Sequence, residues 1–359
     1  MAHDDPSTPA GTRDGADRHR FDVDRLATWM RATVGRLDGP LTVRQFKGGQ
    51  SNPTFWLTDG RARWVLRKKP PGQLLPSAHQ VEREHRVLEA LADTDVPVPA
   101  VHGLCTDAEV IGTPFYLMDV VEGRIFWNVQ LPGLEPAERS AIYEELGRVL
   151  AAVHQVDIDA VGLGDFGRRG GYLARQLKRW TGQYRASETQ AVPPMDALIA
   201  WLEANLPPSD ETTLVHGDYR LDNMVFHPRE PRCLAVLDWE LSTLGHPLSD
   251  LAYTSMLYDI QMPRVGGLLG VDFAETGIPD EATFVSRYRA LTGRSEIPDW
   301  PAFKAFSLFR LAAIAQGVYK RGLEGNASSD QTAMYGAAVG HLAGVACALV
   351  GIDPRAAQR

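Results

Sequence analysis

A short polar segment constrains the fold of this chain more than any other feature. It reads His216-Gly217-Asp218, has Asn223 five residues after the aspartate, and is followed fifteen residues later by Asp238. Short apolar stretches of strand character lie between these polar positions. Each piece alone is common as a turn or a strand end, but their joint spacing argues against an ordinary turn. The fold must therefore hold two carboxylates and one amide at fixed places.

Transfer of a phosphoryl group from ATP needs these residue types together. One carboxylate accepts the proton of the acceptor hydroxyl, while an amide oxygen and a second carboxylate hold the magnesium ions that bridge the phosphates. The spacing of five between Asp218 and Asn223 equals that of the motif H-R-D-x-x-x-x-N, with glycine in place of the arginine. We therefore predict Asp218 as the catalytic base, Asn223 and Asp238 as metal ligands, and ATP and Mg²⁺ as cofactors.

The composition argues against several classes of function. The chain has 359 residues, of which 44% are hydrophobic and 23% charged, a balance that suits two globular lobes. Its net charge of -8 gives no attraction to phosphate backbones or anionic lipid, so we expect neither nucleic acid nor membrane as a partner. The three cysteines are far apart and form no CxxC pair, which favours a reducing cytoplasm over a disulfide framework or a zinc site.

The first third of the chain is strand-rich. Alternating apolar residues and turn signals predict five strands, at 41–46, 54–57, 64–67, 101–105 and 115–121, and one helix over 78–91. Residues 1–20 mix charged residues, Pro and Gly without an apolar core, which predicts a disordered lead-in. We expect an N-lobe at 21–121 with a five-stranded antiparallel sheet and one helix.

Beyond Val121-Glu122-Gly123, the predicted hinge, the apolar period becomes helical, as in 136–156 and 171–184. This pattern predicts a larger, mainly helical C-lobe over 122–359 and an α+β fold of two lobes with a cleft between them. The apolar stretch 335–352 is rich in Gly and Ala, which predicts a buried helix rather than a membrane span.

A small polar loop separates the first two predicted strands and reads Gly48, Gly49, Gln50, Ser51, Asn52. Glycines let backbone N–H groups approach the phosphates of ATP closely. A hairpin without a ligand is the alternative interpretation. We predict that the loop contributes to nucleotide binding.

Three long strings identify a family resemblance: Gly48-Gly49-Gln50-Ser51-Asn52-Pro53, Leu74-Leu75-Pro76-Ser77-Ala78-His79 and Asp238-Trp239-Glu240-Leu241-Ser242-Thr243-Leu244-Gly245. Over about 41–350 the chain resembles the aminoglycoside phosphotransferase-like kinases, and among them the branch fused to acyl-CoA dehydrogenases. The resemblance implies a bilobal protein-kinase-like fold and an adenine held by hinge backbone near Met118 and Val120. It also implies a small-molecule hydroxyl acceptor in the C-lobe and an acyl-CoA dehydrogenase as a partner in the same pathway.

The resemblance also suggests roles for residues around the motif. His216 is expected to shape the catalytic loop rather than to move protons. Asp250 matches the buried aspartate that braces this loop, although a simple acid at a helix N-terminus is the competing interpretation. Arg220 falls where protein kinases carry a lysine near the transferred phosphate; its alternative is a loop arginine paired with Asp222.

One position departs from the family pattern. The phosphate-pairing lysine should end the third strand, where this chain has Arg67, and its helix partner is predicted to be Glu84. Arginine keeps the charge but is forked and bulkier, so either Arg67 or Lys69 on the same strand face can serve as the phosphate contact.

The spacing after Asp238 bears on the type of kinase. Only eleven residues separate Asp238 from Asp250, too few for the activation segment of a protein kinase, and no DFG or APE triplet is present. We predict an enzyme that acts on a small molecule and needs no activating phosphorylation.

A basic stretch, 167–185, contains no Asp or Glu, and Arg175, Lys178 and Arg179 share one helical face within it. A solvated basic face is the plain interpretation. If the face borders the acceptor site, it favours an anion such as a hydroxy acid or a hydroxyacyl-coenzyme A. The alternatives are an aminoglycoside or other antibiotic kinase, and a non-catalytic nucleotide-binding pseudokinase.

Overall fold

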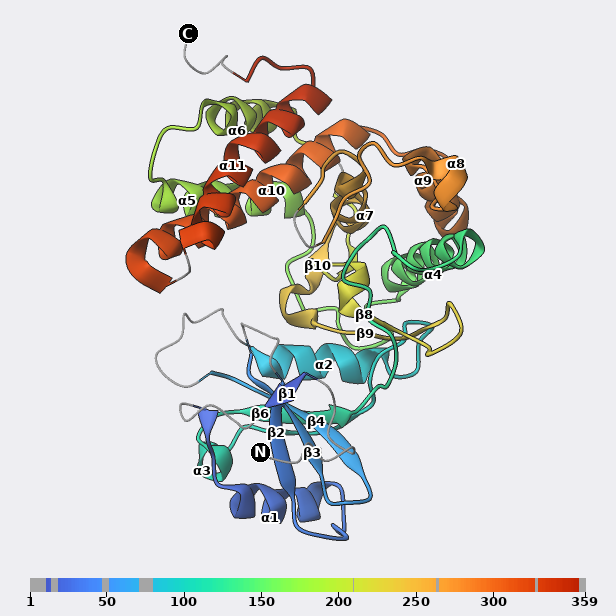
Figure 1. Cartoon of the computed structure of the whole chain (residues 1–359), viewed down its shortest axis with the longest axis vertical. Helices are drawn as coiled ribbons and strands as arrows, with labels where there is room; N and C mark the ends of the chain where they lie inside the picture. The colour runs from blue at the N-terminus through green and yellow to red at the C-terminus, as the bar shows by residue number, and fades with distance from the viewer. Residues whose placement is uncertain are drawn as a thin grey trace. The chain divides into compact units, whose positions relative to one another are not determined.

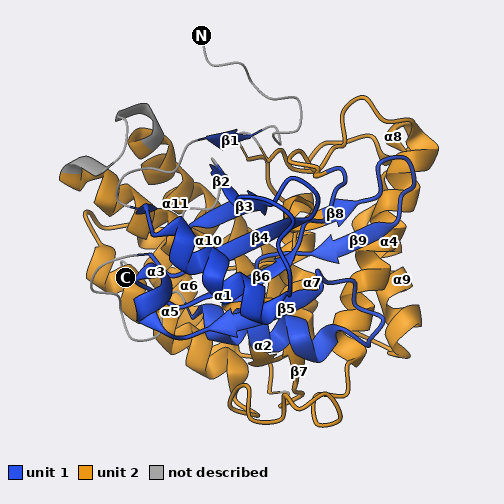
Figure 2. Ribbon diagram, turned by 90° about the horizontal axis from the view of Figure 1, so that it is seen from below, with its two compact units in different colours: residues 1–124, 225–240 blue, residues 125–224, 241–359 orange. Residues whose placement is uncertain are grey.

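The structure is a computed structural model. It describes residues 11–13, 19–46, 52–70, 80–208, 210–262, 265–326 and 329–354, with side chains omitted at 325–326 and 329–331. The predicted loop residues 48–51 and the string 74–79 lie outside the described residues. The chain divides into two compact units, unit 1 with residues 1–124 and 225–240, and unit 2 with residues 125–224 and 241–359 (Figure 2).

Unit 1 is built on an antiparallel sheet. In the described part of the chain its strands are β1 (Thr12–Arg13), β2 (Thr42–Phe46), β3 (Thr54–Thr58), β4 (Arg63–Lys68), β5 (Val101–Cys105) and β6 (Phe115–Asp119). They lie in the order β1-β2-β3-β4-β6-β5 (Figure 2). The predicted meander and the two later strands are therefore present, and the α+β kinase-like fold is confirmed.

The first strand corrects two expectations. Thr12 and Arg13 pair with Phe46 and Gln45 of β2, so the sheet has six strands rather than five. The predicted disordered lead-in at 1–20 is wrong for these two residues. A two-residue strand added to a sheet edge has no alternating apolar pattern, so the sequence gives no signal for it.

The helices of unit 1 cover both faces of the sheet (Figure 1). They are α1 (Val23–Thr33), α2 (Val81–Leu91) and the short α3 (Ala108–Ile111), where one helix was predicted. The Asp22 carboxylate begins α1 by accepting N–H groups of Asp24 and Arg25. Leu26 and Met30, one turn apart, then face the sheet.

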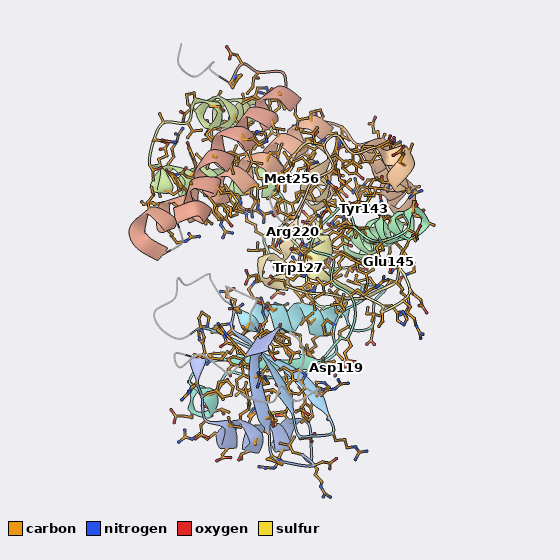
Figure 3. The ribbon with its side chains drawn as sticks, viewed as in Figure 1. Asp119, Trp127, Tyr143, Glu145, Arg220 and Met256 are labelled. Carbon is orange, nitrogen blue, oxygen red and sulfur yellow. The ribbon has the colours of Figure 1, made fainter. Side chains whose placement is uncertain are left out.

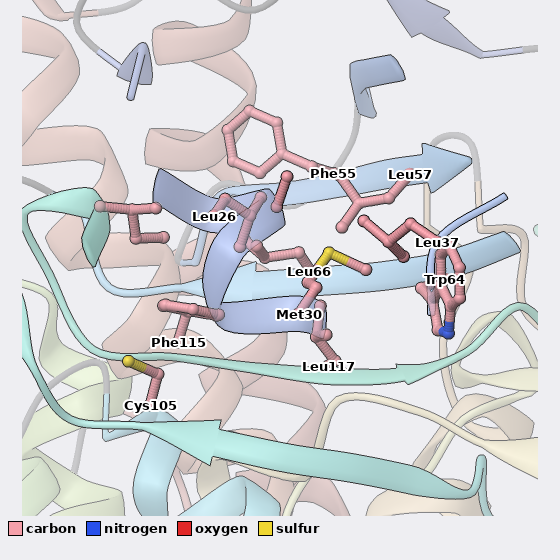
Figure 4. Packing of buried hydrophobic residues seen from close by; sticks show 12 residues of the cluster. Leu26, Met30, Leu37, Phe55, Leu57, Trp64, Leu66, Cys105, Phe115 and Leu117 are labelled. Atoms are coloured by element: carbon pink, nitrogen blue, oxygen red, sulfur yellow. The ribbon is translucent and has the colours of Figure 1, made fainter. Parts of the chain in front are cut away.

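The core of unit 1 lies between α1 and the sheet. Buried side chains of α1, β3, β4, β5 and β6 pack together there (Figure 4), and these include Leu26, Met30, Phe55, Leu57, Leu66, Cys105, Phe115 and Leu117. Burial of an aliphatic or aromatic side chain contributes about 1.5–3 kcal/mol each. The sheet is thus a rigid base for the polar residues of β4 and β6.

Unit 2 is mainly helical, as predicted. Its elements are α4 (Pro136–Gln155), α5 (Tyr172–Ser187), α6 (Pro193–Asn205), β7 (Thr213–Val215), a 3-10 turn (Leu221–Asn223), β10 (Thr243–Gly245), α7 (Pro247–Ser255), α8 (Phe273–Thr276), α9 (Glu281–Thr292), α10 (Trp300–Arg321) and α11 (Ser329–Leu349). The strands β7 and β10 form an antiparallel pair directly before the catalytic loop and before α7. The pair thus holds the start of the loop at His216 beside the start of α7.

The C-terminal helix α11 packs against α10 and α6. Val339, Leu342, Ala343, Ala346 and Cys347 are buried on one of its faces. In the described residues the segment Thr332–Leu349 is the one helix long and apolar enough to cross a membrane, and 33% of it is buried. The expected burial therefore applies to one face of the helix.

The segment 225–240 corrects the predicted lobe boundaries. It was placed in the second lobe, 122–359, but groups with unit 1, which otherwise ends at residue 124 rather than 121. Arg124 pairs with Phe226 through two backbone hydrogen bonds, and the N–H of Val236 donates to the carbonyl of Pro97 at 2.8 Å. Long-range backbone pairing of this kind leaves no local sequence signal. The strands β8 (Met224–Phe226) and β9 (Cys233–Val236) form the hairpin involved.

Candidate active site

Arg67 is the centre of a charged cluster in unit 1. Its Nε atom lies 2.7 Å from Glu84 Oε2, and its Nη2 atom lies 2.6 Å from Asp238 Oδ1 and 3.5 Å from Glu240 Oε2. One guanidinium thus contacts three carboxylates. Glu84 lies on α2, whereas Asp238 and Glu240 follow β9. Arg67 on β4 therefore links these two segments. The buried cationic fork suits this role because it can donate in several directions at once.

Glu84 is held in place by further hydrogen bonds. It accepts from the Tyr116 hydroxyl at 3.0 Å and from the Asn52 side-chain amide at 2.8 Å. Burial raises the pKa of Glu84, and Arg67 opposes that rise. The pKa of Arg67 is raised: burial alone would lower it, but the surrounding acidic groups, Glu84 first, outweigh burial. Arg67 therefore stays a cation in this cluster.

The structure distinguishes the two candidate cations, Arg67 on β4 and Lys69 just after it. Glu84 pairs with Arg67, as predicted, whereas Lys69 pairs with Glu82 at 2.7 Å. Arg67 thus takes the structural place of the family lysine. Which of the two contacts an ATP phosphate stays a prediction.

Asp238, the predicted metal ligand, has a left-handed backbone with φ +66°. Aspartate and asparagine tolerate this region better than other residues with a Cβ, and such strain is common at functional sites. Its Oδ1 atom is bonded to Arg67, while Oδ2 makes no hydrogen bond in the described part of the chain. One carboxylate oxygen is therefore left for another ligand.

The predicted adenine-contacting residues lie at the end of β6. Met118 faces Val65 of β4 and Val101 of β5 in the register of the sheet. Val120 follows the last residue of the strand. The main chain after β6 thus leaves the sheet at the predicted hinge. A contact between adenine and this backbone stays a prediction.

In unit 2, Asp250 of α7 braces the catalytic loop. Its carboxylate accepts the backbone N–H groups of His216 at 2.6 Å and of Gly217 at 2.9 Å. Burial alone would raise the pKa of Asp250, but the His154 contact, 3.5 Å away, and the His216 N–H outweigh it and lower the pKa. A buried, ionised carboxylate with two backbone donors fixes the start of the loop.

Gly217 explains the glycine in the His-Gly-Asp motif. Its φ is +83°, and a Cβ added there would lie 2.6 Å from the carbonyl oxygen of Leu241. A side chain at this position would be both strained and obstructed. His216 beside it is fully buried, and its Nδ1 atom accepts the N–H of Asp218 at 3.2 Å. This geometry supports the loop-shaping role proposed for His216.

Asp218 and Asn223 are joined across the loop. The Asn223 amide donates from Nδ2 to the Asp218 carbonyl at 2.8 Å and to Asp218 Oδ2 at 3.2 Å. Because both acceptors are oxygens, the amide oxygen of Asn223 must point elsewhere, and it makes no hydrogen bond in the part of the chain that is described. The oxygen that would ligate a metal is thus available.

Arg220, labelled in Figure 3, lies between two aspartates of the loop. Its Nε atom is 3.2 Å from Asp218 Oδ1, and its Nη2 atom is 3.2 Å from Asp222 Oδ2. The alternative pairing with Asp222 is therefore present, together with a contact to the predicted base. A role at the transferred phosphate stays a prediction.

The basic face of α5 is only partly available. Arg175 donates to the carbonyls of Gly170 and Arg168, so its guanidinium holds the loop before the helix. Lys178 and Arg179 are exposed, and the Arg179 guanidinium lies 5.3 Å from the ring centre of Trp180. Arg175 therefore acts first as a structural residue, which helical spacing could not indicate.

Three site residues were missed from the sequence: Tyr116, Tyr253 and Arg310. Tyr116 bonds Glu84, and burial, with help from the negative charge of Asp218, raises the pKa of Tyr253. Arg310 donates to the carbonyl of Gly217 from ninety-three residues away. No local pattern signals any of these contacts, because each depends on the packing of distant elements.

The fold and the loop together define a protein-kinase-like phosphotransferase. The model of the phosphotransferase enzyme family (APH) matches residues 42–302, and the chain belongs to this family. A crystal structure from Ralstonia eutropha, provisionally described as an aminoglycoside phosphotransferase, is 49% identical, with a TM-score of 0.85. That match covers 92% of this chain and 99% of the other.

Two further comparisons define the limits of the likeness. Acyl-CoA dehydrogenase family member 10 of Mus musculus is 48% identical over 309 residues, 85% of this chain and 29% of that protein. The chain spans less than half the length of the curated relatives it matches. A thermostable mutant of aminoglycoside phosphotransferase APH(4)-Ia, in a complex with AMP-PNP and hygromycin B, is 15% identical over 89% of this chain and 98% of its own, with a TM-score of 0.58. This last likeness shows the fold alone.

Proposed function

We propose that this protein transfers the γ-phosphoryl group of ATP to a hydroxyl group of a small molecule, with Asp218 as the base. The observation that carries the proposal is the braced loop, in which Asp250 fixes the backbone and Asn223 holds Asp218. Positioning and charge stabilisation account for most of the catalysis in phosphoryl transfer. A preorganised loop of this kind supplies the positioning.

The donor atoms fit magnesium. Asn223 Oδ1 in unit 2 and Asp238 Oδ2 in unit 1 each make no hydrogen bond within the described residues, and both are hard ligands of the type that Mg²⁺ prefers. No group of three His, Cys, Asp or Glu side chains within the described ranges could hold a metal. Mg²⁺ commonly binds through one or two carboxylates and the substrate phosphates, and it neutralises charge on the phosphates when bound. Arg67 and Glu84 would order the nucleotide side of the site.

The proposed acceptor is an anionic hydroxy acid or a hydroxyacyl-coenzyme A. Two observations support it: the exposed cations of α5, and the name of the murine relative, an acyl-CoA dehydrogenase. An enzyme that consumes acyl-coenzyme A is the partner class this proposal implies. A cytoplasmic location is part of the proposal.

An ADP-release screen tests the proposal. Purified protein with ATP and Mg²⁺ is given hydroxy acids, hydroxyacyl thioesters, amino alcohols and aminoglycosides. We expect magnesium-dependent ADP release with an anionic hydroxy compound. Release with aminoglycosides alone would favour the antibiotic-kinase alternative. Binding of ATP without release for any acceptor would favour the pseudokinase.

Asp218→Asn separates binding from turnover. Loss of a general base lowers the rate by about 10²–10⁴-fold, and the thermal shift with ATP and Mg²⁺ should be retained. Asp222→Asn is the matched control, because it removes the same charge from the same loop and from the same partner, Arg220. A comparable rate loss in both variants would contradict the role of Asp218.

A further inference from the structure

Arg310 is a buried cation beside the catalytic loop of unit 2. It belongs to α10 and is only 8% exposed. Its guanidinium carbon lies 5.4 Å from the ring centre of Trp180 on α5 and 5.0 Å from that of Tyr253 on α7. Three helices thus enclose one charge between two aromatic faces.

This arginine has no acidic partner. No carboxylate among the described residues lies within ion-pair distance of it, whereas Arg67, Arg220 and Arg294 each pair with at least one. Its Nη2 atom donates to the Gly217 carbonyl, and its Nε atom is buried without a hydrogen-bond partner. Its Nη1 atom makes no hydrogen bond within the described residues. Unlike Nε, this atom is not fully buried, so a ligand can reach it.

Among the described residues, the arrangement leaves a buried cation without a counter-charge within ion-pair distance. A buried charge normally needs a counter-charge, and breaking a buried ion pair costs about 3–5 kcal/mol. Contacts with aromatic faces return about 0.5–2 kcal/mol each. The position therefore favours a bound anion.

The location is close to the predicted chemistry. Gly217, whose carbonyl accepts from Arg310, directly precedes Asp218 in the loop. Arg310 also packs against Tyr253, whose pKa is raised by burial and, to a smaller extent, by the charge of Asp218. Arg179 contacts the Trp180 ring as well and adds a second, exposed cation. A group bound here would be next to the residue that receives the hydroxyl proton.

We propose that Arg310, with Trp180 and Tyr253, forms an anion-binding site that holds the acidic group of the acceptor. That the bound group belongs to the acceptor rests on the proposed function. That the site binds an anion rests on the Arg310 guanidinium alone. The anionic group is a carboxylate of a free acid or a phosphate of coenzyme A. We propose Arg310 rather than Arg175 as the contact for this anion, because the Arg175 guanidinium is already bonded to the main chain.

Calorimetric titration with four probes tests the site. Malonate and coenzyme A carry the two kinds of anion but no hydroxyl acceptor of the proposed type, while malonamide and pantetheine are their uncharged counterparts. We expect the wild-type protein to bind one of the two anions and neither neutral probe. Arg310→Met should weaken that binding by about tenfold or more, since hydrogen bonds to charged groups contribute about 1.5–3 kcal/mol each.

Two further variants keep the test interpretable. Arg310→Lys retains a charge and a donor for Gly217, so it should fold and bind the anion with an intermediate affinity. Arg321→Met removes an exposed cation from the same helix and should change nothing. Binding of ATP with Mg²⁺ should be equal in all of them.

The results separate the site from the function. Equal anion affinity in wild type and Arg310→Met, or no anion binding by the wild type, overturns the site. If Arg310→Met does not fold, wild-type affinity in Arg310→Lys overturns it. Anion binding that depends on Arg310 without ADP release for any acceptor leaves the site standing and overturns the proposed function.

Discussion

Two largely buried arginines, one in each unit, have opposite charge surroundings. In unit 1, a single guanidinium, Arg67, is in contact with three carboxylates. In unit 2, Arg310 is buried without a carboxylate partner in the described part of the chain, and a neighbouring helix carries exposed cations. A local excess of acid attracts a divalent cation, and a local excess of base attracts an anion.

The two units also hold their key residues by different means. Unit 1 uses side-chain ion pairs around Arg67, which can rearrange when a ligand binds. Unit 2 uses backbone hydrogen bonds to Asp250 and a glycine that admits no side chain. We infer that Asp238, the predicted metal ligand of unit 1, can adapt to a ligand, whereas the loop that holds Asp218 and Asn223 is preorganised.

The largest expected effect comes from Asp238→Asn. Asparagine tolerates the left-handed backbone at this position, so the fold should be kept while one carboxylate ligand is lost. We expect the magnesium-saturated rate to fall by about 10³-fold, equivalent to about 4 kcal/mol. Steady-state ADP release across a magnesium titration measures it.

Glu240→Gln is the control for Asp238→Asn. It removes an equal charge from the same cluster, at a residue that is not a predicted ligand. A rate loss within about tenfold is expected there. An equal loss in both variants would show that the acidic excess as a whole, rather than Asp238, binds the metal.

A smaller effect is expected from Arg67→Met, which leaves Glu84 buried without its cation. Loss of one partner of a buried pair costs about 3 kcal/mol or more in the free energy of unfolding. Arg67→Lys should recover part of that stability, because the ammonium can pair with Glu84. Chemical denaturation measures both.

Arg63→Met is the control on the same strand. Arg63 pairs with Glu122 at an exposed position, where an ion pair contributes about 0.2–1 kcal/mol. If the two methionine variants lose equal stability, the cluster around Arg67 is no more important than a surface pair. In that case the proposed difference between the units would not hold.

The sequence predicted the parts of the site that depend on local spacing. Asp218, Asn223 and Asp238 were proposed from their intervals, and their roles stay predictions; Glu84 was proposed as the partner of the strand cation, and it pairs with Arg67. The missed residues, such as Tyr116 and Arg310, reach the site from distant elements and belong to no motif. Helical spacing placed Arg175 on a basic face but could not indicate its hydrogen bonds to the main chain, and its role at the acceptor stays a prediction.

The same reasoning applies to the fold. The meander, α2 and the long helices follow from apolar periodicity, which is a local signal. The edge strand β1 and the grouping of 225–240 with unit 1 depend on backbone pairing between residues far apart in sequence. Periodicity carries no information about such partners.

The smallest expected effect is on how the free energy of unfolding depends on pH. One buried histidine in each unit allows the comparison. Burial, with help from Arg294 and His154, lowers the pKa of His246 in unit 2 from 6.5 to about 4, although Glu211 opposes the shift. The folded state therefore keeps His246 neutral, while the unfolded chain takes up a proton below pH 6.5. The stability this gives is complete above pH 6.5 and is lost as the pH falls towards 4, by about 3 kcal/mol in all.

His246→Asn should flatten this loss. Asparagine can replace the ring nitrogen that accepts the Leu248 N–H at the start of α7, and it does not titrate. His85 of unit 1 also has a pKa lowered by burial, so His85→Asn is the parallel variant. Denaturation at pH 7 and pH 4.5 measures both, and the pKa of Asp250, despite its burial, is lowered by His154 and His216, away from that range. A loss of stability on acidification that His85→Asn reduces more than His246→Asn would place the proton-sensitive packing in unit 1.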